Sequence, residues 1–209
     1  MARMSVTDRR GKLIEAAIVV MGRDGVANTT TRSIVAEAGM QVGVFHYCFR
    51  SKDELVLEVM RTINERSFQA VGEVLTLSTD AGELIDLATT AYWKHVEDDP
   101  LEHLLTYELT QYALREEQEQ AAAAQYESYT SGMEQFLLAL AQAAGIEWRK
   151  PVDLLARYAL ALIEGMTLQW IVNRDGAMAQ RVLGELADQL RREAGLPERD
   201  RESQHPAGG

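Results

Sequence analysis

The chain has 209 residues, 46% of them hydrophobic and 25% charged, a composition typical of an ordinary globular protein with a sizeable core. Its least charged run, residues 158–172, is shorter than the roughly 20 apolar residues that a membrane-spanning helix needs. The first ten residues hold no apolar secretory core and the single cysteine excludes an internal disulfide, so we expect a cytoplasmic protein.

The charged residues are unevenly distributed along the chain. The net charge is −11, yet residues 1–52 carry eight Lys and Arg against four Asp and Glu, a net +4. The remaining 157 residues carry 13 basic and 28 acidic side chains, a net −15. This asymmetry is typical of a polyanion-binding head on a separate acidic scaffold, although +4 is small enough to be incidental.

The spacing of apolar residues predicts an all-α fold of about nine helices, because they recur at intervals of three and four almost throughout. Two helices are short: one lies between the threonines at 29–31 and Gly39, and the next covers 42–48. The longer ones are expected at 7–24, 52–77, 81–97, 101–117, 119–144, 151–173 and 177–194. Residues 198–209 are polar and aperiodic, and we expect this tail to be disordered.

Turn and cap residues account for the expected helix ends. Gly25 stands where the first helix can stop in a left-handed conformation. Ser51 and Asp80 can each cap the helix that follows. Pro151 suits a first helical turn, because its missing N–H would have no partner there.

The two short helices and the glycine-containing turn between them form the pattern of a helix-turn-helix. The residues that can pack against the first helix are Ile34, Val35, Ala38, Phe45 and Phe49. Gly39 permits the tight turn, and Gly43 would let the second short helix approach DNA closely. The outward side then carries Gln41, Val42, Val44, His46 and Tyr47, where a major groove could be read. The threonines at 29–31 and the helix N-termini are natural phosphate ligands.

Two stretches carry a resemblance to a known family: TTTRSIVAEAG at 29–39 and VGVFHYCFRSKDEL at 42–55. Together they resemble the DNA-binding domain of TetR-family transcriptional regulators. The resemblance implies a three-helix DNA-binding domain over 1–52 and a helical ligand-binding and dimerisation domain over 53–197. It also implies a homodimer, most often a repressor, that binds a near-palindromic operator and is released by a small-molecule effector.

The same resemblance assigns roles to individual residues. Thr30 and Thr31 fall where the family caps its second helix or holds phosphate, and Arg32 falls where a base can be read from that helix. The base-facing positions are Gln41, Val42, Gly43 and Val44, and Lys52 matches a lysine that contacts the DNA backbone. Because Val42 and Val44 offer no hydrogen-bonding side chains, contact with thymine methyl groups and readout of DNA shape gain importance.

Two residues of the third helix have alternative interpretations. His46 stands where the family usually has a phosphate-binding tyrosine, so either it contacts phosphate, with Tyr47 sharing that role, or it is an ordinary surface or packing residue. Cys48 is interpreted as a buried, inert thiol in preference to a redox switch.

The acidic body is rich in aromatic residues and methionine at helical spacing, which either form core or line an apolar pocket. The candidate effector-binding residues are Trp93, Tyr107, Tyr126, Tyr129, Met133, Phe136, Met166 and Trp170. A mostly apolar or aromatic effector fits this composition.

The eighth predicted helix is apolar on more than one face, which suggests that it packs against a second copy of the chain. The candidate dimer-interface residues are Leu155, Leu162, Ile163, Leu183, Leu186 and Leu190. The alternative is that both faces are buried within one subunit.

Motifs for other chemistry are not found in the sequence. His95, Asp98, Asp99 and His103 lack the spacing of a metal site, and no nucleophile elbow, phosphate loop or dinucleotide fingerprint occurs. We therefore expect no enzyme activity, no metal and no cofactor.

The competing hypothesis is a helical adaptor or ligand-binding protein that has lost DNA binding, and the net charge of −15 on residues 53–209 suggests it. This hypothesis predicts no salt-dependent binding to duplex DNA.

Overall fold

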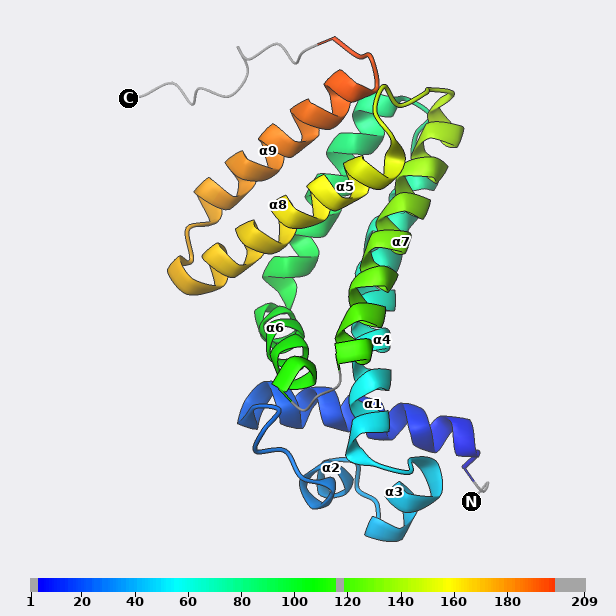
Figure 1. The fold of residues 1–209 in the computed structure, drawn as a ribbon, viewed down its shortest axis with the longest axis vertical. Helices are drawn as coiled ribbons and strands as arrows, with labels where there is room; N and C mark the ends of the chain where they lie inside the picture. The colour runs from blue at the N-terminus through cyan, green and yellow to red at the C-terminus, as the bar shows by residue number, and fades with distance from the viewer. Residues whose placement is uncertain (1–3, 116–118, 198–209) are drawn as a thin grey trace. The chain divides into compact units, whose positions relative to one another are not determined.

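The computed structural model describes residues 4–115 and 119–197, and within these ranges every regular element is a helix, as predicted (Figure 1). The elements are α1 Val6–Asp24, α2 Thr31–Glu37, α3 Val42–Cys48, α4 Lys52–Gly72, the 3-10 helix η1 Glu73–Thr76, α5 Ala81–Asp98, α6 Pro100–Arg115, α7 Glu119–Ala144, α8 Val152–Asn173 and α9 Gly176–Glu193. The predicted disordered tail at 198–209 lies outside the described residues.

Most helix ends lie within two residues of their predicted positions. Ser51 caps α4 by accepting a hydrogen bond from the Glu54 amide at 3.1 Å, and Asp80 caps α5 by accepting one from the Glu83 amide at 2.8 Å. Gly39 adopts a φ of +64°, as its turn requires.

One predicted end is wrong, and one predicted role differs. α4 ends at Gly72, five residues before the predicted end, and the chain continues as η1. Glycine has the lowest helix propensity of all residues except proline, so an α-helix readily ends there. Pro151 lies one residue before α8 in an extended conformation, and not within its first turn.

The chain divides into two compact units. Unit 1 comprises Met1–Gln69 and His95–Tyr129, and unit 2 comprises Ala70–Lys94 and Thr130–Gly209. Three helices, α4, α5 and α7, therefore contribute residues to both units.

Unit 1 contains the three N-terminal helices, which pack as the sequence predicted. Ile34 of α2 and Phe45 of α3 are buried against Leu13 of α1 in one hydrophobic cluster. α6 joins the same cluster through its buried residues Leu105 and Leu109. A boundary at residue 52 would separate these side chains, whereas in unit 1 they share one core.

Polar contacts also join α6 to the N-terminal helices. The Glu108 carboxylate accepts a hydrogen bond from the Val26 amide at 3.1 Å, and the Tyr112 hydroxyl donates to Asp53 at 3.3 Å. Arg66 of α4 pairs with Glu102 of α6 at 3.1 Å and also with Glu15 of α1. These contacts, added to the shared apolar core, explain why α6 and the N-terminal helices form one unit.

Unit 2 is built around α8 and α9, which lie side by side, and the N-terminal part of α5 (Figure 1). Arg191 of α9 fixes this arrangement by donating to the Gly82 carbonyl oxygen at 3.0 Å and pairing with Asp86 at 2.6 Å. In the described part of the chain, no helix combines the length and the apolar character that a membrane crossing requires.

α8 has one buried and one exposed apolar face, and this changes the candidate dimer interface. Leu155, Leu183, Leu186 and Leu190 are buried within unit 2, and Leu162 and Ile163 are half-buried. The four buried leucines have almost no surface left for a second copy. The apolar or small residues that are exposed along α8 are instead Leu154, Tyr158, Ala161, Gly165, Leu168 and Val172.

Candidate DNA interface

The α2 N-terminus is fixed by a reciprocal cap. Thr30 Oγ1 accepts a hydrogen bond from the Ser33 amide at 3.1 Å, and Ser33 Oγ accepts one from the Thr30 amide at 3.0 Å. Since α2 has only seven residues, these bonds satisfy a large share of its free N-terminal amides.

Replacing Thr30 by alanine should lower the free energy of unfolding by about 1 kcal/mol, because the first bond is lost and the short helix has few others to replace it. Urea titration followed by circular dichroism measures this change. Thr30→Ser keeps the acceptor oxygen and should retain nearly all of the wild-type stability. Equal stability of Thr30→Ala and the wild type would show that the cap does not matter.

α3 presents an exposed face that matches most of the predicted DNA-contacting positions. Gln41, Val42, Gly43, His46 and Tyr47 are all exposed, and the Tyr47 side chain is 66% exposed. A Cβ placed on Gly43 would meet no atom within 4 Å, so packing within the chain does not require glycine there. Gly43 therefore adds no side-chain bulk to this face.

The predicted contact residues at the start of α2 differ in their solvent exposure. Arg32 and Thr30 are exposed, and Thr31 is half-buried at the first position of α2. Contrary to the expectation of a phosphate ligand at this position, Thr29 is buried and its hydroxyl donates to the Gly25 carbonyl oxygen at 2.8 Å. The side chain of Thr29 therefore stabilises the turn after α1 and does not face the solvent.

Two further predicted contact residues turn toward the protein. Val44 is half-buried and packs against the hydrophobic cluster of unit 1 and not on the open face of α3. The Lys52 ammonium donates to the Val26 carbonyl oxygen at 2.8 Å and lies 5.4 Å from the centre of the Tyr112 ring. In this arrangement Lys52 contacts α6 and the loop after α1.

The positive charge of the N-terminal helices is partly neutralised inside the protein. Arg10 pairs with Glu54 and Glu58, and Arg23 pairs with Asp24 and Glu37. Within the described residues, by contrast, Arg9, Lys12 and Arg32 form no ion pair. Of these three, Lys12 and Arg32 are exposed, so they are the cations best placed to meet a phosphate.

The candidate effector-binding residues fall in both units. Trp93 and Trp170 meet edge to face in unit 2, with ring centres 5.2 Å apart, and Met166 lies one turn before Trp170. Met133 and Phe136 are half-buried residues of α7 in the same unit. Tyr107, Tyr126 and Tyr129 belong to unit 1, where the Tyr126 and Tyr129 rings lie 5.9 Å apart.

Sequence reasoning missed a polar pair beside the two tryptophans. The Tyr92 hydroxyl lies 2.7 Å from Thr167 Oγ1, and Thr167 is buried. The Trp93 indole N–H is also buried and meets no hydrogen-bond acceptor among the described residues. Only the three-dimensional pairing of α5 with α8 identifies these groups, because Tyr92 and Thr167 are far apart in sequence.

The histidines that flank Pro100 lie against each other. His95 and His103 meet edge to face at 4.9 Å, and His95 Nε2 lies 3.1 Å from Ser67 Oγ. Within the described ranges, no cluster of three or more His, Cys, Asp or Glu residues is arranged to hold a metal ion. Cys48 is buried, as predicted for an inert thiol.

Comparison with known proteins agrees with this geometry. Residues 13–59 match the family model of bacterial regulatory proteins of the tetR family. The nicotine-responsive transcriptional repressor HdnoR of Paenarthrobacter nicotinovorans is 27% identical over 197 residues, which cover 93% of this chain and all of HdnoR.

Solved structures share the fold over most of their length. A TetR-family regulator from Syntrophomonas wolfei superimposes with a TM-score of 0.73 at 15% identity, covering 89% of this chain and 96% of the other, which shows the fold alone. The multidrug binding protein EbrR in complex with imidazole gives a TM-score of 0.59 at 26% identity and covers 93% and 98%.

The capped α2, the glycine turn, the exposed face of α3 and the match over the N-terminal helices lead to one family. The N-terminal helices match the model of the tetR family of bacterial regulatory proteins, and the chain is similar over most of its length to a transcriptional repressor of this type.

Proposed function

We propose that the protein is a ligand-responsive repressor that binds a near-palindromic operator as a homodimer. The observation that carries this proposal is the exposed face of α3, from Gln41 to Tyr47, next to the capped N-terminus of α2. Two such heads would enter successive major grooves about 34 to 36 Å apart on one side of the duplex. Because operator DNA of bacteria lies in the cytoplasm, this function implies a cytoplasmic protein.

The exposed face of α8 supports dimerisation. The exposed apolar and small residues of this face, from Leu154 to Val172, follow one another at alternating intervals of four and three positions. Val172 is 79% exposed. That spacing is the pattern by which two helices pack together lengthwise. Ala161 and Gly165 lie in the middle of the face, where small residues allow two helices to approach closely. We assign the dimer interface to this face, paired with its own symmetry mate.

The effector is proposed to be a small, mostly apolar nitrogen heterocycle. HdnoR is nicotine-responsive by name and similar over its whole length, which makes nicotine the first compound to try. In unit 2, the buried Trp93 N–H beside the Trp170 ring could donate a hydrogen bond to an acceptor nitrogen of such a molecule. Met166, on the same side of α8 as Trp170, would add apolar contact.

The first experiment measures binding of the purified protein to DNA from upstream of its own gene and to random duplex, at two salt concentrations. We expect sequence-selective binding that weakens as salt rises, and release of the operator by nicotine or a related heterocycle. A protein that binds no duplex at either salt concentration contradicts the proposal and favours the adaptor hypothesis.

Gly165→Glu tests the dimer interface. A Cβ at Gly165 meets no atom of its own chain within 4 Å, so the monomer should fold normally. The charge would be buried between two α8 helices, and we expect light scattering to show a monomer where the wild type is a dimer. Gln142→Glu, which adds the same charge to an exposed position of α7, is the control and should remain dimeric. A dimeric Gly165→Glu protein would refute this interface.

A further inference from the structure

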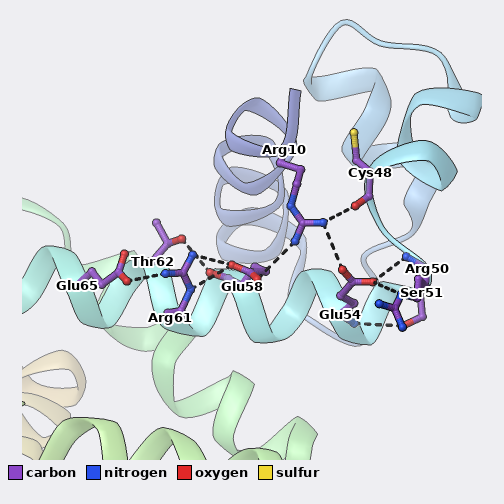
Figure 2. A network of polar contacts seen from close by, with 9 residues as sticks. All are labelled: Arg10, Cys48, Arg50, Ser51, Glu54, Glu58, Arg61, Thr62 and Glu65. Carbon is purple, nitrogen blue, oxygen red and sulfur yellow. Dashed lines mark hydrogen bonds and ion pairs between the residues drawn. The ribbon is translucent and has the colours of Figure 1, made fainter. Parts of the chain in front are cut away.

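Arg10 of α1 connects α1 with the end of α3 and the start of α4. Its guanidinium donates to the carbonyl oxygen of Cys48, the last residue of α3, and to Glu54 at 3.2 Å (Figure 2). It also pairs with Glu58, one turn further along α4, at 3.4 Å. The same group lies 4.2 Å from the centre of the Phe49 ring. Four groups around one guanidinium leave few of its donors for an outside ligand.

Glu54 holds the other side of the turn between α3 and α4. One of its oxygens accepts the Arg50 amide at 2.9 Å while the other accepts Arg10. These two contacts lower the pKa of the Glu54 carboxyl below its usual value, chiefly through the Arg50 amide. The Glu54 carboxylate thus links the backbone of residue 50 to Arg10, which also binds the last carbonyl oxygen of α3.

The charge of Arg10 is balanced within the protein. Its two carboxylate partners also contact other arginines, since Glu54 lies 3.9 Å from Arg50 and Glu58 lies 2.8 Å from Arg61 (Figure 2). Arginine and glutamate alternate through this network, which ends at Glu65, 2.7 Å from Arg61. An arginine placed between two carboxylates contributes little net field at the DNA surface.

We infer that Arg10 is a positioning residue, which sets the orientation of α3 for sequence-selective binding, and that it is not a phosphate ligand. This inference rests on the proposed operator binding. α3 is only seven residues long, and its last carbonyl oxygen and the Phe49 ring are both fixed by the same guanidinium. Lysine could keep the charge of Arg10, but its single ammonium cannot reproduce a planar group that contacts several acceptors and a ring face.

The test compares Arg10→Gln and Arg10→Lys with wild type on operator and on random duplex, over a series of salt concentrations. For Arg10→Gln we expect about tenfold weaker operator binding and less than a twofold change on random duplex. The slope of log affinity against log salt should stay unchanged, because a lost phosphate contact would reduce it by about 1. Arg10→Lys should recover less than half of the lost affinity on a logarithmic scale.

Two further variants separate positioning from simple electrostatics. Glu54→Ala removes a negative charge from the DNA-binding head, so electrostatics alone predicts tighter DNA binding, whereas loss of the clamp predicts weaker and less selective operator binding. Arg61→Gln is the matched control: it removes an exposed cation from the same network without touching α3, and operator selectivity should be unchanged.

Hydrogen exchange gives a readout that does not depend on DNA. In Arg10→Gln, amides of residues 42–51 should exchange about tenfold faster while those of α2 keep their wild-type rates. Equal loss on both duplexes with a smaller salt slope would make Arg10 a phosphate ligand and overturn the inference, as would wild-type exchange in residues 42–51. A wild-type protein that binds no duplex would instead refute the proposed function, and the exchange experiment would still decide the role of Arg10.

Discussion

Phe45→Ala should lower the free energy of unfolding by about 3–5 kcal/mol and abolish operator binding. Phe45 is 1% exposed, and its ring lies 5.7 Å from that of Phe49 in the cluster formed by α1, α2 and α3. Alanine would leave a cavity beside α2 and α3. These helices have only seven residues each, so they cannot rearrange to fill it. Urea unfolding monitored by circular dichroism measures the loss.

Tyr47→Ala is the matched control for this prediction. Tyr47 lies on the same helix but on its exposed face, so its removal should change stability by less than about 0.5 kcal/mol. Operator affinity should nevertheless fall, because Tyr47 lies on the proposed reading surface. If Phe45→Ala lost less than 1 kcal/mol, the packing of α3 described above would be incorrect.

The protein should lose about 2 kcal/mol of stability between pH 7 and pH 5 through His103 alone. Burial disfavours the charged imidazole and, together with the nearby His95, lowers the pKa of His103 from 6.5 to about 4. As pH falls below 6.5, the unfolded chain takes up a proton that the folded protein does not accept. Stability therefore decreases with falling pH until about pH 4, where the folded state also becomes protonated.

Urea unfolding at pH 7 and pH 5 measures this effect, and His103→Gln identifies its source. The variant cannot take up a proton in either state, so the stability difference between the two pH values should shrink by about 2 kcal/mol. His46→Gln removes an exposed histidine of α3 and should leave the difference in place. If His103→Gln kept the full wild-type difference, the buried imidazole would not be its cause.

Local sequence signals predicted the elements because these signals act over a few residues. The caps at Ser51 and Asp80 and the turn at Gly39 depend on neighbours three or four positions away, and the structure confirms each of them. The exception is the end of α4, where the apolar pattern continues beyond Gly72 although the backbone changes to a 3-10 helix.

The prediction of candidate site residues was less accurate where a side chain could either face the solvent or pack against the protein. Helical spacing places Val44 near the DNA surface and the family resemblance places Lys52 there, yet Val44 packs inward and Lys52 reaches the Val26 carbonyl oxygen. The partners are distant in sequence: Val44 packs against a cluster built from several helices, and Lys52 lies between Val26, 26 residues earlier, and the Tyr112 ring of α6. Neither the spacing within one helix nor a short motif carries information about such distant partners.

By itself, the sequence determined the all-helical fold, the helix-turn-helix and the resemblance to TetR-family regulators, because periodicity, caps and a compact motif are local properties of the chain. Only the tertiary structure decided which face of α8 remains exposed, which cations are neutralised and which helices share the core of unit 1. Arg10 contributes to the net +4 of residues 1–52, but folding brings it against Glu54 and Glu58. Burial and ion pairing depend on residues far apart in sequence, so they become visible only when the helices have packed.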